Sequence, residues 1–164
     1  MAAAGSESAK ISAKYLDGLI TYLKPQESKN ILKIFNDTIK MKREGTDPSS
    51  LDKIAEYKLS YSEDYDKALN STIFWKATLI KNIFNSTINN PRKLEEKAKR
   101  QVPDSKLKES IDIVTSIEDC IKSIEEYFKA GFTRVYAHST SPDEIEFVRK
   151  FSKIVLPYFK REKF

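Results

Sequence analysis

The chain has 164 residues, of which 40% are hydrophobic and only four are Gly, a composition typical of a globular unit rather than a linker or a disordered tail. Its 29 basic and 24 acidic residues give a net charge of +5. Because bases and acids are interleaved, as in residues 95–100, they indicate solvated helix faces and argue against a dedicated nucleic-acid-binding surface.

Cys120 is the only cysteine, which excludes an internal disulfide. Residues 1–8 contain neither a basic segment nor the apolar run of a signal peptide, and no stretch reaches the roughly 18 apolar residues of a membrane span. We therefore predict a cytoplasmic protein with no membrane partner and no nucleic-acid partner.

Segments of strand type alternate with segments of helix type along the first part of the chain. Residues 18–22 predict a strand, and residues 25–44 predict an amphipathic helix with a period of 3.6 and Gly45 at its C-cap. After a turn at 46–50, residues 53–61 predict a second strand.

The second part begins with a helical insertion that runs from Asp64 to about residue 100 and is broken at residues 89–91. Ser116 then predicts the cap of a helix ending at 130–131, before a strand at residues 132–138. Ser141, with Pro142 at the first helical position and an acid at the third, predicts the N-cap of the last helix.

This alternation predicts an α/β fold with a parallel sheet and crossover helices, either an open doubly wound sheet or part of a barrel. A complete (β/α)₈ barrel takes roughly 250 residues, so the chain holds at most part of one. The helical insertion follows the third strand region, counting the small-residue segment at residues 2–4 as the end of a first strand. We treat residues 1–164 as a single partial domain.

The common signatures of nucleotide-binding loops, paired-cysteine metal sites and serine hydrolases are absent. With one histidine, the chain cannot build a histidine-rich metal site. We therefore assign no metal ligand.

A small-residue turn at the start of the chain is a candidate anion site. Ala4, Gly5 and Ser6 lead from a strand end into a helix, where free backbone N–H groups can hydrogen-bond a phosphate without obstruction by bulky side chains. In the alternative interpretation, these residues are an irregular chain end whose small side chains are incidental.

Four further residues are candidate substrate contacts. His138 ends a strand, where ligands bind in parallel α/β sheets, although a histidine there can also cap the strand. Tyr22 and Lys24 follow the first strand and lie at the same rim, where a lone lysine is often only solvated. Trp75 pairs with Phe74 in the insertion, and such a pair serves either as core or as a ligand platform.

Taken in order, these pieces resemble the luciferase-like superfamily, and within it the deazaflavin (coenzyme F420)-dependent oxidoreductases, including their glucose-6-phosphate dehydrogenases. The resemblance rests on an ordered set of short segments rather than on one motif. These are Ala2-Ala3-Ala4-Gly5, Asp17-Gly18-Leu19-Ile20, the strand IAEYKLSY at 54–61, Ala68-Leu69-Asn70, Phe74-Trp75, Glu126-Tyr127, residues 130–138, and Leu156-Pro157.

The resemblance implies the C-terminal half of a (β/α)₈ TIM barrel, from the end of the fifth strand through the eighth helix. It also implies coenzyme F420 as cofactor, with FMN as the alternative used in related monooxygenases. The turn at Ala4 and Gly5 would lie against the cofactor's phosphate-bearing tail. The family's acid/base residues lie in the other half, so none is carried over.

The resemblance also bears on the substrate and on partners. Two residues of the family's sugar-phosphate pocket correspond to positions near Tyr22 and Lys24. Two positively charged residues of that pocket correspond to Asn85 and Ser110, which are uncharged and cannot bind an anion by charge. We therefore expect hydride transfer to or from another small organic molecule. The alternative is a non-catalytic half-barrel subunit or remnant. For partners, we expect a homo-oligomer or a complementing N-terminal half.

Overall fold

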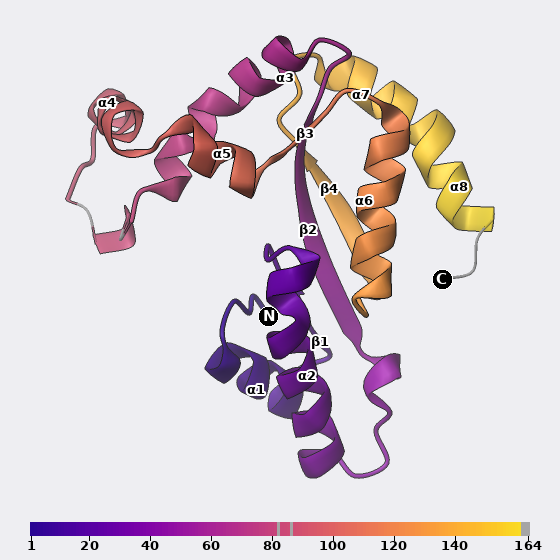
Figure 1. Cartoon of the computed structure of the whole chain (residues 1–164). Helices are drawn as coiled ribbons and strands as arrows, with labels where there is room; N and C mark the ends of the chain where they lie inside the picture. Colours follow the sequence, from indigo (N-terminus) through magenta and orange to yellow (C-terminus); the bar gives the residue numbers. More distant parts are fainter. Residues whose placement is uncertain (82, 86, 162–164) are drawn as a thin grey trace. The chain divides into compact units, whose positions relative to one another are not determined.

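The computed structural model describes residues 1–81, 83–85 and 87–161 and divides into two compact units (Figure 1). The first unit contains Met1–Tyr57 and Cys120–His138, and the second contains Lys58–Asp119 and the described residues 139–161. Three elements contribute residues to both units: β2 (Asp52–Tyr61), α6 (Ile117–Lys129) and β4 (Arg134–Ser139).

The first unit is built around parallel pairing of β1 with the first half of β2. Its elements are α1 (Ser6–Tyr15), β1 (Gly18–Thr21), α2 (Pro25–Lys42), the start of β2 (Asp52–Tyr61), most of α6 (Ile117–Lys129) and most of β4 (Arg134–Ser139). The ladder runs from Gly18 opposite Asp52 to Thr21 opposite Ala55, and Ala2 adds a parallel bridge to Ile20. This confirms the predicted strands at 18–22, 53–61 and 132–138 to within two residues.

Burial in the first unit follows the period of each element. In α2, Ile31, Phe35 and Ile39 recur at four-residue spacing and are buried, because those positions share one face of a helix. In β2, Ala55 and Tyr57 are fully buried, whereas the alternating residues are only partly so. Cys120 of α6 is also fully buried.

The second unit contains the insertion and the end of the chain. Its elements are α3 (Tyr65–Thr72), the 3₁₀ turns η2 (Ile73–Leu79) and η3 (Ile83–Asn85), α4 (Pro91–Gln101), α5 (Asp104–Ser110), β3 (Asp112–Val114), α7 (Glu144–Lys150), the π-helical turn η4 (Phe151–Val155) and α8 (Leu156–Arg161). β3 pairs in parallel with the last three residues of β2. The sequence analysis missed this strand.

The predicted helix start at Ser141 is wrong by two residues. Asp143 is the N-cap of α7, since its carboxylate accepts a hydrogen bond from the N–H of Glu146 at 2.8 Å. Ser141 is buried instead, because its Oγ accepts the backbone N–H of Tyr61 at 2.9 Å and hydrogen-bonds Oγ of Ser139 at 2.6 Å. The hydroxyl of Ser141, which could cap a helix, thus accepts a hydrogen bond from the backbone at the end of β2.

Several predicted helix boundaries are confirmed, whereas α5 lies where no helix was predicted. Asp64 caps α3 by accepting the N–H groups of Asp66 and Lys67, and Asn90 caps α4 at the predicted break in the insertion. Gly45 and Gly131, which follow α2 and α6, have positive φ angles of 74° and 103°, as expected for glycine after a helix. Within the described residues, no helix is both long and apolar enough to cross a membrane.

The close approach of β1 to β2 requires glycine at position 18. A Cβ atom at Gly18 would collide with the carbonyl oxygen of Asp52, a backbone atom fixed by the ladder. We expect Gly18→Ala to lower the free energy of unfolding by about 1–3 kcal/mol, the usual cost of overpacking. Urea unfolding measures this. The control is Gly5→Ala, since a Cβ at Gly5 meets nothing within 4 Å; equal stability of the two variants would contradict the steric argument.

Candidate functional site

A pocket of about 310 Å³ lies in the first unit, beside the C-terminal end of β1. Its lining combines small, aromatic and acidic side chains: Ala2, Ala3, Ala4, Ile20, Thr21, Tyr22, Glu56 and Tyr136. The volume is at the lower end of the range for small-molecule pockets. The pocket is our candidate functional site because it joins the predicted small-residue turn to the predicted rim of β1.

The turn passes directly into α1. The φ and ψ angles of Gly5 are −150° and 171°, an extended conformation that any residue adopts, so backbone strain does not require glycine there. The backbone N–H of Gly5 donates to Oγ of Ser8 at 3.3 Å, and Oγ of Ser8 donates to the carbonyl of Gly5 at 2.9 Å. Gly5 and Ser6 are exposed, and the space where a Cβ of Gly5 would stand is open.

A carboxylate stands on the pocket wall with two hydrogen-bond partners. Oε1 of Glu56 lies 2.7 Å from Nδ1 of His138, and a second hydrogen bond joins Glu56 to Tyr136. The side chain of Glu56 is 18% exposed and that of His138 is 31% exposed. His138 therefore belongs to a hydrogen-bonded group of three side chains.

Electrostatics keep the phenol of this group neutral. Partial burial, together with the hydrogen bond to Glu56 and the negative charge of Glu56, raises the pKa of Tyr136 to about 12. Tyr136 therefore retains its O–H donor throughout the pH range in which enzymes work.

The other sequence-predicted residues lie differently. Tyr22 lines the pocket and is 59% exposed, as expected for a rim position. Lys24 immediately precedes α2, where its backbone N–H donates to Oε2 of Glu27 at 3.2 Å, and its side chain is outside the pocket lining. Trp75 belongs to the second unit and packs edge-on against Phe74 with ring centroids 6.2 Å apart.

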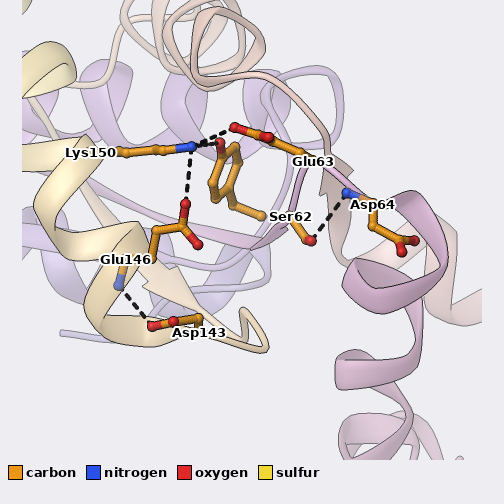
Figure 2. Close-up of polar contacts among 7 residues, drawn as sticks. Ser62, Glu63, Asp64, Asp143, Glu146 and Lys150 are labelled. Carbon is orange, nitrogen blue, oxygen red and sulfur yellow. Dashed lines mark hydrogen bonds and ion pairs between the residues drawn. The ribbon is translucent and has the colours of Figure 1, made fainter.

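A second polar cluster, in the second unit, surrounds Lys150 (Figure 2). Nζ of Lys150 donates to Tyr61 Oη and Glu63 Oε1, each at 2.7 Å, and lies 3.1 Å from Oε1 of Glu146. Glu63 is the largest of the influences that hold the pKa of Lys150 well above its ordinary value. An ammonium has three N–H donors, and these three acceptors match them, so the cluster secures α7 to the end of β2 rather than binding a ligand.

The sequence analysis missed Glu56 and Tyr136. A usable signal was present for Tyr136, which lies two residues before His138 and hence on the same face of the strand. Glu56 is one of several charged residues in its strand, together with Lys53 and Lys58, so the sequence does not single it out. Across the described ranges, no group of three or more His, Cys, Asp or Glu side chains is placed to hold a metal ion.

Comparisons with known proteins show what this chain is similar to. No family model matches the chain. The F420-dependent glucose-6-phosphate dehydrogenase of Segniliparus rotundus is 26% identical over 113 residues, which are 69% of this chain and 33% of that protein. The enzyme of the same name from Microbacterium testaceum is 22% identical over 162 residues, or 97% of this chain and 47% of that protein.

The solved structures agree. An F420-dependent secondary alcohol dehydrogenase in complex with an F420-acetone adduct is 27% identical with a TM-score of 0.79, over 93% of this chain and 46% of that one. The chain thus has the fold of half of a luciferase-like (β/α)₈ barrel. Within that class it is related to the coenzyme F420-dependent proteins, as the sequence predicts, and it spans about a third to a half of the length of these relatives.

The neutrality of Tyr136 is testable by ultraviolet titration. Its raised pKa means that the neutral phenol contributes stability that is fully present below about pH 10 and is lost as the pH rises toward about 12. We expect Tyr136→Phe to leave the phenolate absorbance at about pH 10 unchanged. A clear loss of absorbance at that pH in the variant would show that Tyr136 ionises as an ordinary tyrosine.

Proposed function

We propose that this chain is part of a coenzyme F420-dependent oxidoreductase that transfers hydride between the deazaflavin and a small organic substrate. The observation that carries the proposal is the match to the F420-dependent secondary alcohol dehydrogenase over 93% of this chain, together with the pocket beside the Ala2–Gly5 turn. The deazaflavin, when bound, supplies the hydride chemistry.

The residues at the turn fit such a cofactor. The open space beside Gly5 would be filled by any larger side chain, and the three alanines before it leave the pocket wall unobstructed. The ten-residue helix α1 begins at Ser6, so its first N–H groups and its dipole favour a phosphate at this end. Glu7 opposes an anion there, but Lys10 pairs with its carboxylate at 2.7 Å.

In this proposal, the side chains of the chain bind and orient rather than react. Ala4, Gly5 and Ser6 would form the turn against which the phosphate-bearing tail lies, at the N-terminus of α1, and Tyr22 would cover the rim of the pocket. His138 would position Glu56 on the pocket wall. The cytoplasm remains the predicted location.

The substrate differs from glucose 6-phosphate in this proposal. Asn85 is exposed, and Oγ of Ser110 donates to the carbonyl of Lys106 at 2.9 Å, so neither position supplies a cation for a sugar phosphate. We expect no F420-linked turnover of glucose 6-phosphate by this chain, measured as the change in F420 absorbance. Measurable reduction of F420 by that substrate would contradict the assignment of these two positions.

The choice of cofactor is tested by binding. We expect the chain to bind F420 more tightly than FMN, as measured by titrating the fluorescence of each cofactor with protein. Tighter binding of FMN would favour a luciferase-like monooxygenase instead. The remaining part of the site would come from a second polypeptide half or from another copy of the chain, and light scattering of the same samples would report the oligomer.

The role of the turn is tested at position 5. We expect Gly5→Val to raise the Kd for F420 by about tenfold to several hundredfold, because the branched side chain blocks N–H groups that each contribute about 1.5–3 kcal/mol to a charged ligand. The melting temperature should be unchanged, since the backbone of Gly5 is extended and its Cβ direction is open. Gly5→Ala is the graded control. Unchanged affinity in folded Gly5→Val would remove the turn from the site.

A further inference from the structure

The hydrogen-bonded group of Glu56, Tyr136 and His138 has a geometry that the cofactor turn does not explain. Glu56 comes from β2, and the other two come from β4, two residues apart and hence on one face of that strand. Glu56 and Tyr136 both line the pocket. An ionised carboxylate only accepts hydrogen bonds, so His138 Nδ1, 2.7 Å from Oε1, carries the proton and orients the carboxylate.

The charge of this wall restricts what the pocket can take. Among the described residues that line it, Glu56 is the one that carries a charge, and the others are apolar, hydroxylic or aromatic. A second anion would be repelled by the carboxylate, whereas a hydroxyl group would donate to it. The phenol of Tyr136, which stays neutral, offers an oxygen beside the same ligand position.

We propose that Glu56 and Tyr136, positioned by His138, form a binding site for an aliphatic hydroxyl group, so that this pocket takes a neutral hydroxylated ligand and rejects a carboxylate of the same shape. This inference deepens the proposed function, because the hydroxyl belongs either to an alcohol substrate or to the hydroxylated chain of the cofactor. In this proposal, Glu56 and Tyr136 contact the ligand, and His138 positions the carboxylate of Glu56.

The single histidine of the chain makes the test direct. His138 gives one set of imidazole signals in NMR spectra, and these report its contact with Glu56. The folded chain is titrated with 1,2-propanediol and with lactate, which differ by replacement of a hydroxymethyl group with a carboxylate. We expect the diol to shift the His138 signals with a Kd about tenfold lower than that of lactate.

Variants separate charge from shape. Glu56→Gln keeps the outline of the side chain and should remove most of the preference for the diol, whereas Tyr136→Phe should weaken diol binding without favouring lactate. The matched control is Asp52→Asn, which removes a carboxylate on the same strand that pairs with Arg134 at 3.1 Å and is outside the pocket lining. It should leave the preference intact. Equal binding of diol and lactate, or an unchanged preference in Glu56→Gln, would overturn the proposal.

A third titration, with F420, identifies the source of the hydroxyl group and also tests the proposed function. If F420 shifts the His138 signals, the hydroxyl comes from the cofactor; if only the diol does, it comes from the substrate. The fluorescence anisotropy of F420 measures cofactor binding independently. Binding of F420 without a shift by any ligand refutes the hydroxyl site alone, whereas a diol shift without F420 binding refutes the cofactor assignment alone.

Discussion

Strand β2 hydrogen-bonds to β1 through residues 52–55, and the register of this ladder decides which side chains of the first unit face the core. Ala55 and Tyr57 are fully buried, and Glu56 between them reaches the pocket. A slip of one residue would exchange these faces, burying the carboxylate and exposing the tyrosine. Gly18 permits the observed register, because a Cβ atom at this position would collide with the carbonyl oxygen of Asp52.

Two ligand-facing features of the first unit differ in electrostatic sign. The N-terminus of α1 favours an anion, and Lys10 offsets the one acid in its first turn. The wall formed by Glu56 disfavours one. A ligand with a phosphate at one end and hydroxyl groups elsewhere satisfies both, which is a stricter requirement than either feature sets alone.

The sequence predicts the regular elements correctly, but not the short strand β3 or a side chain with two possible hydrogen-bond partners. Long segments with clear periods, such as α2 and β2, are identified from pattern alone, as are the start of the helical insertion at Asp64 and its break at residues 89–91. β3 has only three residues, too few to show an alternation. Ser141 has a hydroxyl that could cap a helix, but this hydroxyl accepts the backbone N–H of Tyr61 at the end of β2 instead. Tyr61 and Ser141 are far apart in the sequence, so local sequence does not reveal this contact.

The same reasoning applies to the candidate site. Ala4, Tyr22 and His138 could be proposed because strand ends are predictable positions for ligands. Glu56 and Tyr136 could not be paired in advance, since 80 residues separate them and the pairing of β2 with β4 brings them together. Trp75 lies in the second unit, outside the lining of this pocket, and packs edge-on against Phe74, so its contact with substrate stays a prediction.

The burial of Cys120 has a practical consequence. It is the sole thiol of the chain and lies fully inside the first unit, on a helix face beside Ile124 and Tyr127. An alkylating reagent therefore reacts only when this unit opens, and its rate of reaction measures how often the native state does so. Cys120 thus reports local opening of the unit that contains the pocket, and no label has to be introduced.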